Sequence, residues 1–443
     1  MLEMNIGLAT FLMFFILLIF LTTGLPVVFV LGGVTVIFTV LLWGPSGFNI
    51  IVARTFASMQ GFVLLAIGLF VLMAKILSKS GLAEKLYEVM HMWLCPIKGG
   101  LAIGTIVICA IFAAMCGISG AATVTLGLIA IPAMTKYNYN LRLTLGSVMG
   151  GGALGILIPP SAPMIIFGLL GNVSVGKLFA AGILPGLLLS VIFSLYVYIR
   201  AAINPKLAPP VPKGERYTLK EKLKASKDLL MPALLVFGVL GSIFGGVATP
   251  GEAAAVGAFG SLLCVAINKR LSWEMLKEVS YETLGLTVMI MWIMMAASAF
   301  SGLYNGIDAP DMINEIISGL EINRWLIIVL MQLILMLLGC FLEPTSIMFI
   351  TVPIFIPIIE LLGFDPIWFG AIFTMNMEMS YLTPPIGFNL FYIRGIVSDD
   401  VPMMDIYRSA IPFVILQLLG LILVMAFPKI ALYLPHLIFG HPM

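Results

Sequence analysis

The chain has 443 residues, of which 61% are hydrophobic and only 10% are charged, and its mean hydropathy is +1.14. A soluble domain cannot hide so large an apolar fraction, so the composition predicts an all-α protein that crosses a membrane several times. The formal net charge of +2 carries no information about partners, and no basic block suggests nucleic-acid binding.

The first half, residues 1–204, contains apolar runs of the length that crosses a bilayer. Spans are predicted at 6–21, 27–43, 62–77 and 183–199. Residues 80–94 form an amphipathic stretch, which predicts either an arm that braces a moving part or an ordinary interfacial helix. The region 101–136 is too long for one straight span and is interrupted at Gly117-Ile-Ser-Gly120, while the region 141–170 contains Pro159-Pro160.

The second half, residues 229–443, repeats this plan after a polar connector at 205–228 that is rich in lysine and proline. Spans are predicted at 230–244, 253–267, 284–303 and 411–427, with a short amphipathic piece at 272–282. The region 325–360 is interrupted at Leu342-Glu-Pro-Thr-Ser346, and the region 366–396 contains Pro384-Pro385.

The basic residues near the span ends predict a cytoplasmic connector. Lys98 and Lys136 flank the first long run and fall on the connector's side only if that run is a re-entrant hairpin. The first hairpin then enters from the cytoplasm and the second from outside, so the two halves are predicted to be inverted repeats. About 225 residues separate Pro159 from Pro384, as such a repeat requires.

Each Pro-Pro pair is expected to break its helix, because proline lacks the amide hydrogen and clashes with the preceding turn. The carbonyl groups freed by a break cannot face lipid and are tolerated only in protein or at a wet cavity. Two interrupted helices in matching positions point to the binding site of a secondary transporter.

A first Na⁺ site is predicted where the first hairpin turns beside the first break, because Na⁺ prefers oxygen ligands and both segments offer carbonyl or hydroxyl oxygens. Its residues are Gly117, Ser119, Gly120, Thr123, Gly155 and Pro159. The alternative is a small-residue motif that only packs helices closely.

A second Na⁺ site is predicted at the corresponding place in the second half. Its residues are Glu343, Thr345, Ser346, Thr383, Pro384 and Gly387. Acidic residues within apolar spans, such as Glu343 and Glu378, are functional candidates by default. The alternatives are that Glu343 caps its own helix and that Glu378 binds the free amides of the broken helix rather than a proton or cation.

The substrate is expected between the two hairpin tips, where the helix starts that follow the breaks aim positive dipole ends inward. The predicted contacts are Ser119, Ser161, Ser346, Thr383 and Asn389. Arg54 and Arg394 are candidate counter-charges for a carboxylate, although Arg394 is expected rather to end a span.

Enzymatic activity is not expected. Gly117-Ile-Ser-Gly120 fits the motif of an intramembrane serine protease, but that chemistry needs a histidine near the serine. The three histidines, at positions 91, 436 and 441, lie in an amphipathic arm and at the C-terminus. No nucleotide-binding motif suggests ATP-driven transport. The five cysteines have no metal-ligand spacing and are interpreted as small core residues.

Five stretches resemble the large membrane subunit of tripartite ATP-independent periplasmic (TRAP) transporters, the DctM-like permease. They are Phe112-Ala-Ala-Met-Cys-Gly-Ile-Ser-Gly-Ala-Ala-Thr-Val124, Gly155-Ile-Leu-Ile-Pro-Pro-Ser161, Leu178-Phe-Ala-Ala-Gly-Ile-Leu-Pro-Gly186, Ala248-Thr-Pro-Gly-Glu-Ala-Ala-Ala-Val-Gly-Ala258 and Leu382-Thr-Pro-Pro-Ile-Gly-Phe-Asn389. The chain departs from the common pattern at Ala121, where a serine is frequent, and at Gly251, where a threonine is frequent. Ala121 removes one possible ion ligand.

The resemblance implies an elevator carrier of a bacterial or archaeal cytoplasmic (inner) membrane, in which a domain of two hairpins and two broken helices moves against a scaffold. It implies Na⁺-coupled import of small organic acids, namely dicarboxylates, keto acids, sugar acids or sialic acids. A periplasmic substrate-binding protein would deliver the substrate and a small four-helix membrane subunit would brace the scaffold. The chain begins at the large subunit's first span, so the small subunit is expected to be a separate polypeptide. The alternatives are a stand-alone Na⁺- or H⁺-coupled carboxylate carrier and, more remotely, a channel.

Overall fold

The computed structural model describes residues 5–61, 63–212, 217–319 and 322–440, and these residues form helices joined by short turns and loops. Six of the helices are long and apolar enough to cross a membrane, and a seventh span is formed if the bent pair of α4 and α5 counts as one. The prediction of an all-α protein with several membrane spans is confirmed.

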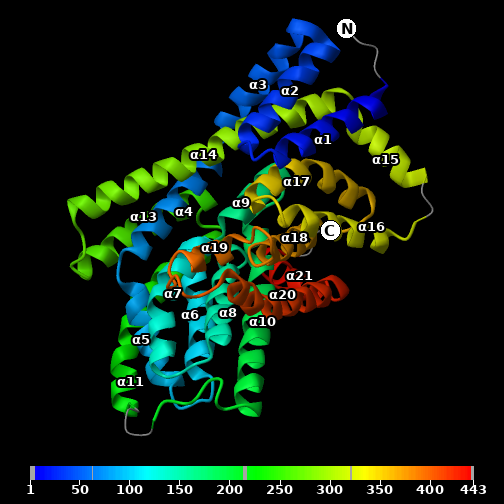
Figure 1. Cartoon of the computed structure of the whole chain (residues 1–443). Helices are drawn as coiled ribbons and strands as arrows, with labels where there is room; N and C mark the ends of the chain where they lie inside the picture. The colour runs from blue at the N-terminus through cyan, green and yellow to red at the C-terminus, as the bar shows by residue number, and fades with distance from the viewer. Residues whose placement is uncertain (1–4, 62, 213–216, 320–321, 441–443) are drawn as a thin grey trace.

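The chain begins with helices that lie at the top of Figure 1 and continue down into the molecule. They are α1 (Ile6–Thr22), α2 (Val27–Trp43), α3 (Phe48–Met59), α4 (Val63–Ser78) and α5 (Leu82–Leu94). The predicted amphipathic stretch is therefore a helix, and it bends away from α4 by 61°. The sequence reading missed α3. Phe62, the predicted start of the third span, lies outside the described residues.

The first long run is a pair of helices, α6 (Gly100–Cys116) and α7 (Ser119–Lys136), which pack against each other. Gly117 ends α6 in the left-handed conformation, with φ of 61°, which a residue without a Cβ adopts at little cost. Ile118 is extended, and α7 begins at Ser119. The interruption predicted at residues 117–120 is thus the turn between two helices.

The first broken helix consists of α8 (Leu141–Ala153), a short 3-10 turn (Leu154–Ile156), and α9 (Ala162–Leu170), and α10 (Val175–Ile203) follows it. Residues 157–161 are not helical, and they include the Pro159-Pro160 bond, which is cis. The prolines therefore interrupt the helix where the sequence predicted.

The connector contains one short helix, α11 (Leu219–Ala225), and residues 213–216 of it lie outside the described residues. Its first part binds the ends of the first hairpin and broken helix through backbone hydrogen bonds. The amide of Asn140 donates to the carbonyl of Leu207 at 2.8 Å, and that of Gly99 donates to Ala208 at 3.1 Å. The connector is thus fixed against the bottom of the molecule as drawn in Figure 1.

The second half contains the same two motifs in the same order. Its helices are α12 (Leu230–Phe244), α13 (Pro250–Ile267), α14 (Trp273–Gly306), α15 (Ala309–Gly319), α16 (Arg324–Gly339), α17 (Pro344–Leu361), α18 (Pro366–Ser380), α19 (Phe388–Arg394), α20 (Met403–Ala426) and α21 (Lys429–Phe439). Helices α16 and α17 form the second hairpin, and α18 and α19 are the parts of the second broken helix. The bond between Pro384 and Pro385 is also cis.

One prediction in this half is wrong. The amphipathic piece at 272–282 and the span at 284–303 are one continuous helix, α14, and not two elements. No glycine or proline separates them, and two ion pairs hold the amphipathic end against α4. Lys75 lies 2.6 Å from Glu282 and Lys79 lies 2.7 Å from Glu278.

The helices gather into two groups. Helices α2, α3, α4 and α13 pack with one another or with α14, and these five helices are called the support group here. The hairpins and broken helices lie beside this group, in the centre of Figure 1. Within them, the ring of Phe167 on α9 lies 5.3 Å from that of Phe373 on α18, so the two broken helices share one buried core.

Candidate ion and substrate site

The tip of the first hairpin rests on the first break. A Cβ added to Gly117 would overlap the carbonyl oxygen of Pro160. A Cβ added to Gly155 would lie 3.1 Å from the Cα and the amide nitrogen of Ser119. The backbones therefore approach as closely as glycine allows, which places several residues of the first predicted ion site side by side.

The second hairpin contacts the second break in a similar way. The amide of Ile386 donates to the carbonyl of Cys340 at 3.4 Å, and Cys340 directly follows α16, the first helix of the second hairpin. A Cβ added to Gly339 would lie 2.8 Å from the hydroxyl of Ser380, just before the break. Each half thus pairs its own hairpin with its own broken helix.

Two contacts join the halves at this level. The hydroxyl of Ser119 donates to Oδ1 of Asn389 at 3.0 Å, and Nδ2 of Asn389 donates to the carbonyl of Met149 at 3.2 Å. Both side chains are fully buried. A Cβ added to Gly120 would lie 2.7 Å from the ring of Tyr392. The first hairpin therefore contacts both broken helices, and Asn389 links it to α8.

Thr123 contributes an unsatisfied oxygen to this region. Its side chain is fully buried, and its hydroxyl has no hydrogen-bond partner among the described residues. It lies so close to α8 that a Cβ on Gly152 would overlap it. A buried hydroxyl without a partner is rare in folded proteins, and a bound ion or water normally supplies the missing contact.

At the second tip, Glu343 precedes the first residue of α17. Its carboxylate makes no capping hydrogen bond to the helix amides, so the capping alternative is wrong. It accepts a hydrogen bond from the hydroxyl of Thr345 at 3.0 Å. Ser346 is buried one residue further along. The carboxylate thus bonds a hydroxyl of its own helix but none of the helix amides, which leaves it oxygen positions that could bind a cation.

A cavity of about 90 Å³ reaches both hairpin tips. The tips contribute Gly117, Ile118, Glu343 and Thr345, and the second break contributes Tyr381. The rest of the wall is apolar and includes side chains from the first break and from α4 and α14 of the support group, namely Val71, Ile156, Ala162, Pro163, Ile166, Leu286, Met289 and Ile290. The volume has room for several water molecules, and the cavity lies between the hairpins and the support group.

The hydroxyls of Ser161 and Thr383 are already engaged. Ser161 donates to the carbonyl of Ile156 and accepts from the amide of Met164 at 3.4 Å, so it bridges the first break and caps α9. Thr383 donates to the carbonyl of Met379 at 2.8 Å. Both residues hold the breaks in shape in this conformation.

Glu378 is fully buried between α18 and α20. Its Oε1 accepts from Nε2 of Gln417 at 3.1 Å, whereas its Oε2 and Oε1 of Gln417 lack partners among the described residues. Both of these atoms are hydrogen-bond acceptors, so neither finds a donor among the described residues. The side chain thus binds a glutamine, which the sequence reading did not foresee.

The two candidate arginines do not line the cavity. The backbone of Arg54, on α3, accepts a hydrogen bond from Ser298 of α14 at 3.2 Å. Arg394 is the last residue of α19, and its guanidinium donates to the carbonyl of Val401 at 2.8 Å. As expected, Arg394 ends its helix.

The sequence reading missed Tyr381 and Tyr392. Tyr381 lies directly before the second break, and Tyr392 lies one helical turn after Asn389, so it points to the same side of α19. The sequence feature that could have indicated Tyr392 is its position three residues after Asn389, a predicted substrate contact.

The family model of the tripartite ATP-independent periplasmic transporter, DctM component, matches residues 14–430. The chain belongs to the DctM family. It is 35% identical to the C4-dicarboxylate TRAP transporter large permease protein DctM of Pseudomonas aeruginosa, over 90% of this chain and 92% of that protein. It is 28% identical to the sialic acid TRAP transporter large permease protein SiaM of Vibrio cholerae, over 95% of this chain and 97% of that protein.

A solved structure shares the fold of this DctM-family protein. The YdaH transporter of Alcanivorax borkumensis, described as having an unusual topology, superposes with a TM-score of 0.64 at 14% sequence identity. The superposition covers 88% of this chain and 90% of the other. The two relatives named above are permeases, and this DctM-family chain is a multi-pass membrane transporter subunit.

Proposed function

We propose that this DctM-family permease is the large subunit of a Na⁺-coupled TRAP transporter that imports small organic acids. The observation that carries the proposal is the junction of Ser119 with Asn389, where the first hairpin meets the second broken helix beside the unsatisfied hydroxyl of Thr123. This junction supplies closely spaced oxygen atoms in a region that lipid cannot reach.

The proposed Na⁺ sites are those predicted from the sequence. In the first, Thr123 and the carbonyl groups around residues 117–120 and 155–159 bind the ion. In the second, Glu343, Thr345 and Ser346 do so with the carbonyl groups around residues 383–387. Ser346, which is buried near the start of α17 beside Thr345, supports the second site.

The substrate class follows from the names of the relatives, which include a C4-dicarboxylate and a sialic acid permease. Both substrates carry carboxylates, so we propose a small organic acid that enters the cavity between the hairpin tips. Ser119, Ser346 and Asn389 remain its proposed contacts, although none of them lines the cavity in this conformation and the hydroxyl of Ser119 is bonded to Asn389. Ser161 and Thr383 would contribute only after their present hydrogen bonds break.

The proposed movement is of the elevator type. The cavity wall is shared between the hairpins and the support group, so a displacement of one against the other would carry the site and leave its two tips together. We infer that the halves are inverted repeats and that the connector faces the cytoplasm of a bacterium or archaeon. A soluble periplasmic binding protein and a small membrane subunit would complete the tripartite assembly that the family's name describes.

One observation favours a second candidate, a carrier coupled to protons. Glu378 and Gln417 are bonded to each other, and each also has a buried oxygen without a partner among the described residues. Buried acids within membrane segments often mark proton pathways. Proton coupling therefore competes with Na⁺ coupling for this chain.

The test is uptake of labelled dicarboxylates, keto acids and sialic acid by liposomes that contain the chain and its small subunit. A Na⁺ gradient and a proton gradient are applied separately, each with and without the binding protein. The proposal predicts uptake that needs both Na⁺ and the binding protein. Uptake driven by protons alone would support the second candidate, and uptake indifferent to the binding protein would indicate a stand-alone carrier.

A further inference from the structure

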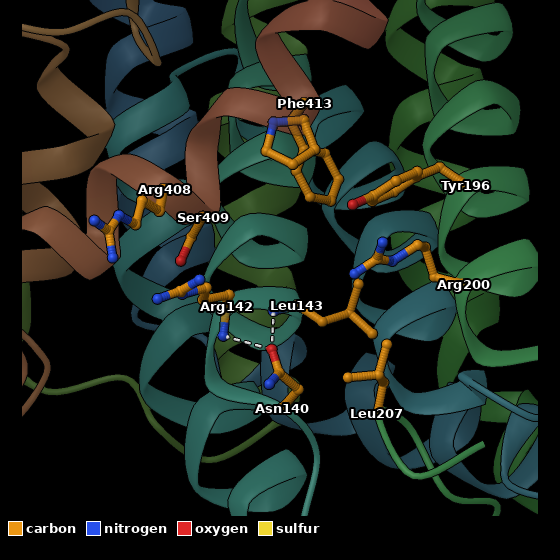
Figure 2. A pocket seen from close by; sticks show the side chains of 10 residues that line it. Asn140, Arg142, Leu143, Tyr196, Arg200, Leu207, Arg408, Ser409 and Phe413 are labelled. Atoms are coloured by element: carbon orange, nitrogen blue, oxygen red, sulfur yellow. Dashed lines mark hydrogen bonds between the residues drawn. The ribbon is translucent and has the colours of Figure 1, made fainter. Parts of the chain in front are cut away.

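A pocket of about 310 Å³ lies between α8, α10, α20 and the first part of the connector, and it shares no lining residue with the cavity at the hairpin tips. Three arginines line it: Arg142 in the first turn of α8, Arg200 in the last turn of α10, and Arg408 on α20. In Figure 2 the side chain of Arg200 reaches toward the middle of the pocket from one side, whereas those of Arg142 and Arg408 lie on the other side and point away from the middle.

The positive charge of this pocket is largely uncompensated. Arg142 binds Asp405 of α20 through two nitrogens, at 2.8 and 3.2 Å from Oδ1. In the part of the chain that the structure describes, Arg200 and Arg408 have no carboxylate within 4 Å. Arg200 and Arg408 thus leave two uncompensated positive charges around the pocket, and the charge of Arg200 lies toward its middle, where an anion would offset it.

The other lining groups suit an oxyanion. The pocket contains Asn140 and Tyr196 in addition to the arginines. Oδ1 of Asn140 accepts from the amides of Arg142 and Leu143, so its NH₂ group remains the available donor on that side chain. Guanidinium forks match the geometry of phosphate oxygens and bind them through paired hydrogen bonds.

The position of the pocket distinguishes a lipid from a soluble anion. Arg200 lies near the end of the apolar span Val175–Ile203, on the side of the connector. Next to lining residues of the pocket, α10 exposes Val191 and Leu195, and α20 exposes Ile411 and Ile415. Basic pockets between membrane helices bind acidic lipid headgroups. An apolar helix face next to such a pocket can hold the acyl chains of the same lipid.

We propose that this pocket binds the phosphate of an anionic phospholipid headgroup, with the acyl chains lying on the exposed faces of α10 and α20. The lipid would join α8, α10 and α20, of which only α8 and α20 are linked by an ion pair in this region. The assignment is independent of the coupling ion and of the transported substrate, because the pocket and the cavity at the hairpin tips share no residue.

The test compares phosphatidylglycerol with phosphatidylcholine of the same acyl chains, and with inorganic phosphate. Lipid retention by native mass spectrometry and the thermal unfolding midpoint of the purified protein are measured for the wild type and for Arg200→Gln/Arg408→Gln. The matched control is Lys220→Gln/Lys224→Gln, which removes two exposed charges from α11 in the connector.

Phosphatidylglycerol is expected to be retained and to raise the midpoint in the wild type and the control, whereas phosphatidylcholine is not. Its apparent affinity is expected to fall about tenfold or more in the arginine variant. If the double variant does not fold, Arg200→Gln, whose side chain is exposed and reaches toward the middle of the pocket, provides the comparison.

Equal retention of phosphatidylglycerol by the arginine variant and the control would overturn the proposal, as would equal retention of the two lipids by the wild type. If inorganic phosphate raises the midpoint as much as phosphatidylglycerol does, the pocket is a site for free phosphate and the lipid assignment is wrong.

Discussion

Gly117→Ala is expected to separate the first hairpin tip from the first break while the helices remain folded. Gly117 has φ of 61°, and an added Cβ would overlap the carbonyl oxygen of Pro160 and lie 3.1 Å from its carbon. Both obstacles are backbone, so no side chain can rotate away. The tip has to move instead, and the oxygens of the first proposed Na⁺ site move with it.

The expected free-energy cost of Gly117→Ala has two parts. An alanine in the left-handed conformation costs about 1–2 kcal/mol, and overpacking against a fixed backbone adds about 1–3 kcal/mol. Gly24→Ala isolates the first part, because Gly24 has φ of 78° and its added Cβ would meet no atom within 4 Å. The difference between the variants, about 1–3 kcal/mol, corresponds to an apparent Na⁺ affinity roughly 5- to 150-fold weaker.

The assay is the Na⁺ concentration dependence of substrate uptake in proteoliposomes, together with the thermal unfolding midpoint. Gly117→Ala is expected to need much more Na⁺ for half-maximal uptake, whereas Gly24→Ala keeps the wild-type value. Gly285→Ala, a helical position with open space around the added Cβ, serves as the neutral control. A wild-type Na⁺ dependence in Gly117→Ala would refute the reasoning that the tip and the break form one ion site.

Three further predictions concern contacts made by the two broken helices. Ser119→Ala and Asn389→Ala are expected to be non-additive in a double-mutant cycle of unfolding free energies, with a coupling of about 0.5–3 kcal/mol; additive effects would show that their 3.0 Å hydrogen bond contributes nothing. Glu378→Gln is expected to leave Na⁺-driven uptake intact, because the new amide still offers an oxygen to Gln417; loss of Na⁺-driven uptake in a folded variant would contradict this and favour proton coupling. Gly146→Ala is expected to lower the stability by about 1–3 kcal/mol, because the added Cβ would lie 2.6 Å from the carbonyl oxygen of Ser409 on α20; an unchanged unfolding midpoint would show that α8 and α20 can separate at no cost.

Residues that break helices made most of the fold predictable from the sequence. Glycine at 117 and the proline pairs at 159 and 384 act on the backbone within a few residues, so the interruptions were located from the sequence. The continuity of α14 was not predictable in this way. A change from amphipathic to apolar composition does not itself end a helix, and the amphipathic end forms ion pairs, such as that of Glu282 with Lys75, to a helix far away in the chain.

The candidate site was predictable in its residue types but not in its hydrogen bonds. Ser119 and Asn389 were both predicted, yet no pattern indicated that they bind each other across 270 positions. Ser161 was predicted as a substrate contact on its chemistry alone. Its engagement with the carbonyl of Ile156 depends on the path of the chain through the break, which the sequence does not specify.

The central claim, that the hairpin tips and breaks bind Na⁺, is tested most directly by equilibrium binding of radioactive ²²Na⁺ to the purified protein. The matched variants are Thr123→Val and Thr39→Val, since both hydroxyls are fully buried without a described partner but Thr39 lies on α2 of the support group. The account predicts saturable binding that Thr123→Val weakens about tenfold or more, as expected for the loss of an ion ligand, and that Thr39→Val leaves unchanged. Absence of saturable binding, or equal binding by the two variants, would contradict it.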